Sequence, residues 1–160
     1  MQIEMTIKLM VDPITNLPII LLRDRDGQRV LPIWVGASEA NAIALQIENI
    51  TTPRPMTHDL LRNVIHDLKA EIRKVVVSDL KDNTFYALIH LEVNGEALAV
   101  DARPSHAIAL ALRARAPIFV EGRVIDNAKT NDFAPDKTDA ERLQKWLESL
   151  DPDEMGKYKM

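Results

Sequence analysis

The sequence contains no cysteine, and this absence removes several kinds of site at once. Disulfide bonds, thiolate metal sites and a cysteine nucleophile are all excluded. Because a chain without disulfides is compatible with a reducing compartment, we expect a cytoplasmic location.

Long apolar runs are missing as well. No stretch reaches about 18 apolar residues, the length that a membrane-spanning helix needs. The first residues, Met1 to Thr6, lack the basic region followed by an apolar segment that marks a signal peptide. We therefore expect neither secretion nor a membrane as a partner.

Aromatic residues are scarce, and no catalytic signature motif occurs. The chain has two Trp, two Tyr and three Phe, so stacking of nucleic-acid bases on aromatic rings has little support. The sequence has no H-x-x-x-H, G-x-x-x-x-G-K, G-x-G-x-x-G or G-x-S-x-G pattern. Zinc-protease, P-loop, Rossmann and hydrolase-elbow chemistry are thus unsupported.

What is present indicates one globular domain. The chain has 160 residues, of which 46% are hydrophobic and 28% charged. Its net charge of −4 argues against a generally basic surface. Residues 1–120 carry 13 basic and 14 acidic side chains (−1), and residues 121–160 carry 7 and 10 (−3). The first 120 residues are therefore close to neutral, which leaves room for local basic patches.

Alternating and apolar segments predict the strands of a sheet. Hairpin turns are expected at Asp26-Gly27, at residues 81–84 and at Asn94-Gly95. Pro32 within its strand predicts an edge position or an irregularity in the strand. The predicted strands cover residues 3–11, 19–22, 30–35, 72–80, 85–93, 97–100 and 118–120.

Helices are expected between these strands. One begins near Gly36 with Ser38 as its N-cap, and a second begins with Thr57 as its N-cap. The second carries an apolar stripe that is expected to pack on the sheet. The stripe consists of Leu60, Leu61, Val64, Ile65 and Leu68.

The third helix follows the stretch from Asp101 to Arg113, with Pro104 suited to its first turn. We expect residues 121–136 to form a loop, residues 138–150 a short amphipathic helix with a capping box, and residues 151–160 a frayed tail. The predicted fold class is α/β of the α+β kind. It is a compact single domain whose mixed, mostly antiparallel sheet is packed by two to three helices.

Polar side chains crowd at the three helix starts, where unpaired backbone N–H groups and the helix dipole favour anions such as phosphate. Ala42-Ile-Ala-Leu45 recurs as Ala107-Ile-Ala-Leu110, so two equivalent strand-to-helix units would bring their polar starts together. The polar groups are Ser38 and Glu39, then Arg54, Thr57, His58 and Asp59, then Asp101, Arg103, Ser105 and His106.

These residue types suit phosphodiester hydrolysis. Imidazoles titrate near neutral pH, and carboxylates can bind Mg²⁺ or Mn²⁺. For the acids and hydroxyls, ordinary helix capping is the plain alternative, and for Arg54 and Arg103 it is a salt bridge to Asp59 or Asp101. The candidate metal ligands are Asp59, Asp101 and Glu39; the candidate catalytic residues are Asp59, Asp101, His58 and His106; the candidate substrate-binding residues are Arg54, Arg103, Ser105 and Thr57.

Several segments closely resemble the bifunctional nuclease family, and in order they cover about residues 3–120. They are Leu31-Pro-Ile-Trp-Val-Gly36, Glu39-Ala40, Pro53-Arg-Pro-Met-Thr-His-Asp-Leu-Leu61, Phe85-Tyr-Ala87, Asp101-Ala-Arg-Pro-Ser105 and Ala107-Ile-Ala-Leu110. The resemblance implies a compact α/β domain over residues 1–120, often homodimeric, with nuclease activity on RNA and DNA. Residues 121–160 lie outside it. The chain departs from the family pattern at His106, where the family usually carries Asp.

Two functional hypotheses follow. The first is a metal-assisted nuclease that acts on single-stranded or flexible RNA or DNA, in which Asp59 and Asp101, with Glu39, hold the metal or orient water and His58 or His106 moves protons. The second is a non-catalytic dimeric module that binds a small anion or a protein partner. The low basicity of the chain and the substituted His106 favour the second hypothesis.

Overall fold

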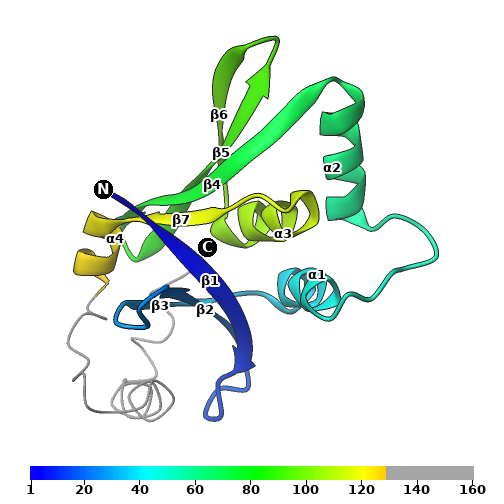
Figure 1. The fold of residues 1–160 in the computed structure, drawn as a ribbon. Coiled ribbons are helices and arrows are strands. Elements are labelled where there is room, and N and C mark those ends of the chain that lie inside the picture. Colours follow the sequence, from blue (N-terminus) through cyan, green and yellow to red (C-terminus); the bar gives the residue numbers. More distant parts are fainter. Residues whose placement is uncertain (129–160) are drawn as a thin grey trace.

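Seven strands form one sheet in the computed structural model, which describes residues 1–128 of the chain (Figure 1). Across the sheet the order is β3-β2-β1-β7-β4-β5-β6, and among these strands β4 and β7 are the parallel pair. The predicted mixed, mostly antiparallel sheet of an α+β domain is confirmed. The strands are β1 (Gln2–Val11), β2 (Pro18–Asp24), β3 (Val30–Trp34), β4 (Ala70–Lys81), β5 (Thr84–Val93), β6 (Glu96–Ala102) and β7 (Ile118–Glu121).

Tight turns fix the register of the long hairpins. Asn94 and Gly95, with φ of 52° and 79°, join β5 to β6, and Asp82 and Asn83, with φ of 51° and 62°, join β4 to β5. Two successive residues with positive φ match the twist of the flanking strands. Pro32 lies in β3, which is an edge strand as predicted.

Four helices accompany the sheet: α1 (Ala37–Ile47), α2 (Thr57–Asp67), α3 (Pro104–Ala114) and α4 (Gly122–Asn127). α3 contacts α1, α2, β4 and β5, and the three longer helices gather near one another in Figure 1. None of the described helices has the length and apolar character needed to cross a membrane. α4 corrects the expectation of a loop over residues 121–136, since burial of Val124 and Ile125 stabilises a short helix there. The helix predicted at 138–150 lies outside the described residues.

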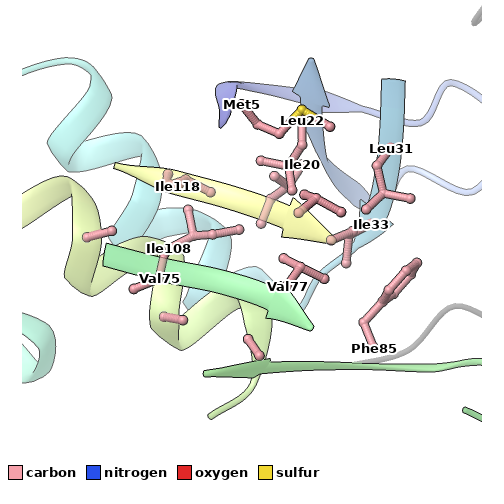
Figure 2. Packing of buried hydrophobic residues seen from close by; sticks show 14 of the residues in the cluster. Met5, Ile20, Leu22, Leu31, Ile33, Val75, Val77, Phe85, Ile108 and Ile118 are labelled. Carbon is pink, nitrogen blue, oxygen red and sulfur yellow. The ribbon is translucent and has the colours of Figure 1, made fainter. Parts of the chain in front are cut away.

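The core lies between the sheet and α3. Figure 2 shows Val75 and Val77 of β4 and Ile118 of β7 in the same cluster as Ile108 of α3. Residues 107–111 of α3 are all at most 1% exposed, which accounts for the absence of charge from Ala107 to Leu112. Each fully buried aliphatic side chain contributes about 1.5–3 kcal/mol, so this helix is a rigid support for the polar residues at its start.

The first two helices begin differently from the prediction. Gly36 and Met56 are the N-cap residues, whereas Ser38 and Thr57 lie exposed in the first turns. β3 runs almost directly into α1, so the helix starts before Ser38. At α2 the carboxylate of Asp59 accepts a hydrogen bond of 2.9 Å from the backbone N–H of Met56, and this bond replaces a cap from Thr57.

The predicted packing of the α2 stripe on the sheet is correct only for Ile65, which packs against the core. No residue of α2 is fully buried, and Leu60 and Leu68 are 56% and 71% exposed. The opposite, polar side of the helix faces the neighbouring helix because Asp59 bonds to Arg113 of α3. An attractive buried charge thus overrides the tendency of the apolar stripe to turn inward.

Candidate functional site

Arg113, near the end of α3, connects all three long helices. Its side chain is 3% exposed, and its Nε donates to Oδ1 of Asp59 on α2 over 2.7 Å. One terminal nitrogen donates to the carbonyl of Ala109 within α3 at 2.9 Å, and the other to the carbonyl of Ala42 on α1 at 3.0 Å. Because a buried guanidinium requires such partners, the positions of the three helices are tied together.

Asp59 completes this arrangement from the start of α2. Its two oxygens accept the N–H of Met56 and the Nε–H of Arg113. Burial acts to raise the pKa of Asp59, but these hydrogen bonds and the charges of Arg113 and Arg62 outweigh burial and lower the pKa. Asp59 is therefore held ionised as a structural and electrostatic partner of Arg113, a pairing that replaces the expected salt bridge to Arg54.

Two imidazoles and a carboxylate lie beside the Arg113–Asp59 ion pair, which is called the Arg113–Asp59 clamp below. The ring centroids of His58, on α2, and His106, on α3, lie 5.5 Å apart. Nε2 of His106 lies 3.6 Å from Oε1 of Glu39 on α1, an ion pair when the imidazole is protonated. Glu39 folds back over the start of α1, where a Cβ added at Gly36 would collide with its Oε2. Each of the three helices thus supplies one polar side chain to the His58–His106–Glu39 cluster.

The environment of His58 favours its neutral form. Burial lowers the pKa of His58 most, and the positive charges of Arg113 and His106 lower it further, against the opposing effect of Asp59 and Glu39. A neutral imidazole at pH 7 can accept a proton from a nucleophile. The two histidines therefore differ in their surroundings: His58 has a lowered pKa, whereas Nε2 of His106 lies 3.6 Å from Oε1 of Glu39.

The other predicted residues are dispersed around this cluster. Ser105 is buried in the first turn of α3, and Arg103 is the exposed N-cap of the same helix. Arg54 is exposed in the connector before α2, where its carbonyl accepts the hydroxyl of Thr52 at 2.7 Å. Thr57 is exposed at the first position of α2.

Asp101 lies apart from the other predicted acids. It is exposed on β6 and pairs with Leu88 of β5, next to the pair formed by Val100 and Ile89. Ile89 belongs to the core that faces α3. Since neighbouring side chains on a strand point to opposite faces, Asp101 is directed to the face away from that core. The structure does not bring Asp101 together with Asp59.

This placement determines how a metal would fit. Within residues 1–128, no group of three or more His, Asp or Glu side chains is arranged to hold a metal ion. Asp59 already receives two hydrogen bonds, and Asp101 points to the other face of the sheet. Asp59, Asp101 and Glu39 therefore do not fit a metal as a single group.

Sequence reasoning missed Arg113. A single arginine follows six uncharged residues in α3, four positions after Ala109. Such a residue on a buried helix needs an acidic partner, and this was the available signal. Its partner, Asp59, lies 54 positions away in the sequence, so the pairing itself becomes visible only in the fold.

Comparison with known proteins places these residues in a family. The sequence model described as the bifunctional nuclease domain matches residues 20–132, which include all of the His58–His106–Glu39 cluster. The chain belongs to the bifunctional nuclease domain family.

Relatives of this family member fall into two groups. An uncharacterized protein of Mycobacterium tuberculosis is 40% identical over 150 residues, which cover 87% of this chain and 88% of the relative. Bifunctional nuclease 1 of Arabidopsis thaliana is 28% identical over 130 residues, covering 74% of this chain and 40% of the plant protein. Bifunctional nuclease 1 of Oryza sativa subsp. indica is 28% identical over 112 residues, covering 68% and 34%. The chain thus spans less than half of these plant proteins.

The Arg113–Asp59 clamp yields a stability prediction. Asp59→Ala leaves the Arg113 guanidinium buried without a counter-charge and should lower the free energy of unfolding by about 3 kcal/mol. Urea unfolding followed by circular dichroism measures this change. Asp67→Ala, at an exposed acid of the same helix, should change it by less than about 0.5 kcal/mol. Equal losses in the two variants would contradict the clamp.

The lowered pKa of His58 yields a pH prediction. The unfolded chain takes up a proton on this residue near pH 6.5, while the folded protein does so only at lower pH. The free energy of unfolding should therefore fall as pH decreases below about 6.5, and be unaffected by His58 above about pH 7.5. Urea titrations between these pH values should show that the free energy of unfolding of His58→Gln changes less with pH than that of the wild type. His66→Gln, at an exposed position of α2, should keep the wild-type slope; if both variants retain it, His58 is not held neutral by the fold.

Proposed function

We propose that this protein hydrolyses phosphodiester bonds of RNA or DNA, and that His58 and His106 transfer the protons. The observation that carries the proposal is the His58–His106–Glu39 cluster, in which two imidazoles lie 5.5 Å apart at helix starts inside the segment matching the nuclease family. The plant relatives are named bifunctional nucleases, which supports the same activity.

Hydrolysis needs one group to take a proton from the attacking water and another to give a proton to the leaving oxygen. The neutral His58 suits the first role. His106, whose Nε2 faces the carboxylate of Glu39, suits the second. The start of α3, with the exposed Arg103 as its N-cap, would hold the phosphate between them. Glu39 orients the His106 ring and balances its charge.

A divalent metal, Mg²⁺ or Mn²⁺, is a separate hypothesis, in which Glu39 is the candidate ligand that lies beside the histidines. The steps assigned above to His58 and His106 do not depend on it. The proposal also places the protein in the cytoplasm, which the lack of cysteine supports.

A nuclease assay tests the proposed roles. Purified protein should cleave labelled single-stranded RNA or DNA, and His58→Ala and His106→Ala should each reduce kcat/KM by about a hundredfold or more. His90→Ala is the control, because it removes an imidazole of β5 that lies next to the core residue Ile89 and is therefore directed to the other face of the sheet. Activity that is equal in all four proteins would indicate a contaminant.

Two further measurements in this assay separate the roles of metal and acid. Loss of activity in EDTA with recovery in Mg²⁺ or Mn²⁺ would support the metal hypothesis. Asp101→Ala should retain most activity if the histidines act alone, since Asp101 faces the other side of the sheet. A loss as large as that of His106→Ala would place Asp101 in the reaction and overturn the histidine-only assignment.

The exposed face of α2 favours a second proposal, a homodimer. Leu60, Leu61, Val64 and Leu68 are 41–71% exposed along one side of the helix. Leu98 and Val100 of the edge strand β6 are also exposed. They pair with Leu91 and Ile89 of β5, so their side chains lie on the same face of the sheet as the core residues that contact α3. A two-fold axis would let α2 of each copy cover β6 of the other, the self-complementary form of most dimers. A non-catalytic dimeric module remains the alternative if the nuclease assay is negative.

The dimer proposal predicts that charge on the α2 face separates the copies. Wild-type protein should sediment as a dimer at micromolar concentration, and Leu68→Glu should sediment as a monomer. Leu17→Glu, at a loop position that is 47% exposed, should leave the dimer intact. A monomeric wild type would rule out this interface.

A further inference from the structure

Two adjoining cavities lie along the polar side of α2. The first has a volume of about 260 Å³ and lies between α1, α2 and the connector that joins them, with Arg54, Asp59 and Asn63 in its wall. The second, of about 440 Å³, lies between α2, the end of α3 and the start of β4, with Arg115 and His66 in its wall. Arg62 and Arg113 line both cavities and are joined by a hydrogen bond of 3.4 Å, so the two cavities adjoin across this contact and are called the groove below.

Three arginines besides Arg113 line this groove: Arg54, Arg62 and Arg115. Arg54 and Arg115 form no ion pair within residues 1–128, and the charge of Arg62 contributes, with that of Arg113, to the lowered pKa of Asp59. Arg62 donates to the side-chain oxygen of Asn63 at 3.1 Å and to the carbonyl of Arg113 at 3.4 Å, both of them uncharged acceptors. By contrast, Arg25 and Arg73 form ion pairs with carboxylates. The positive charge of the groove is therefore available to a ligand.

The acids of the groove do not cancel this charge. Asp59 is neutralised by the buried guanidinium of Arg113. Glu71, in the wall of the second cavity, lies 3.4 Å from Arg73. The walls thus carry four arginines (Arg54, Arg62, Arg113 and Arg115) against two acids (Asp59 and Glu71), and this excess of positive charge favours an anion that carries several charges.

We infer that Arg54, Arg62 and Arg115 form a phosphate-binding groove for the backbone of a single nucleic-acid strand, an inference that rests on the proposed nuclease function. The groove follows the side of α2 that carries Asp59, and His58, the preceding residue of the same helix, belongs to the His58–His106–Glu39 cluster. A strand cleaved at the histidine cluster would thus continue past Arg54 and Arg62 to Arg115.

The lining also indicates how the strand is recognised. Among residues 1–128, no Phe, Tyr or Trp lines either cavity, so stacking of bases on these residues contributes little there. Binding should instead come from arginine–phosphate contacts, which release counterions and weaken as salt increases. The groove should therefore accept a strand with little dependence on base sequence.

Salt-dependent binding tests this groove without relying on cleavage. The probe is a fluorescent oligothymidylate of about ten nucleotides, within the usual site size for single strands, titrated in EDTA and followed by anisotropy. Each lost phosphate contact should reduce the slope of log K against log salt by about 0.7. Arg54→Gln, Arg62→Gln and Arg115→Gln should each show that reduction, and the triple variant about three times as much.

Arg25→Gln is the matched control, because Arg25 is exposed at the β2–β3 turn and paired with Glu4. It should bind as the wild type does. Arg54 and Arg115 are both exposed, so their variants test the groove even if Arg62→Gln unfolds. Thermal melting by circular dichroism identifies a variant that has lost its fold.

The outcomes separate the groove from the reaction. Wild-type binding with unchanged slopes in the exposed arginine variants would overturn the groove and leave the nuclease proposal intact. Reduced slopes in a protein that cleaves no substrate would support the groove and overturn the nuclease. If a polyglutamate peptide binds with the same arginine dependence while the oligothymidylate does not, the ligand is an acidic protein and the inference is wrong.

Discussion

A buried guanidinium organises the functional half of this fold. Arg113 extends from the largely buried α3 and bonds to Asp59 of α2 and to the carbonyl of Ala42 in α1. Removing a cation from water is unfavourable unless its donors are satisfied, so the three helices must approach closely enough to supply acceptors. The starts of these helices then converge, and Glu39 comes to lie 3.6 Å from His106.

The same pairing orients α2 with its polar face inward. At 100° per residue, Asp59, Arg62, Asn63 and His66 share one side of the helix, and all four line the cavities. The apolar residues occupy the opposite side and are exposed. One short helix therefore presents a histidine at its start, arginine along its inner side and an apolar surface outward. The catalytic, strand-binding and dimer proposals all use this helix, on different sides.

The sequence predicted those elements whose causes are local. Turns such as Asn94-Gly95 require positive φ, which Asn and Gly adopt readily. The side chains of the strands alternate between the covered and the uncovered face of the sheet, so the spacing of apolar residues and turn residues predicted the antiparallel hairpins. Predictions failed where the orientation of a helix or side chain depends on residues far away in the sequence. The side of α2 that faces inward depends on Arg113, which lies 54 residues from Asp59. Likewise, Asp101 is near His106 in the sequence, but the register of β6 against β5 directs it to the other face of the sheet.

This protein has a small net charge and yet can bind anions locally, because its acids pair with arginines in some parts of the surface and leave other arginines without an ion pair. Glu4, Glu71 and Glu92 each lie near an arginine on the surface, where they contribute little to stability. On the cavity side of α2, by contrast, Asp59 is bonded to the buried Arg113, and the exposed Arg54 and Arg115 form no ion pair within residues 1–128. Net charge is a poor guide to such a site, since the potential in a groove is set by the charges that line it. A change of Asp59 that released Arg113 would therefore alter the field in the groove and the position of His58 together.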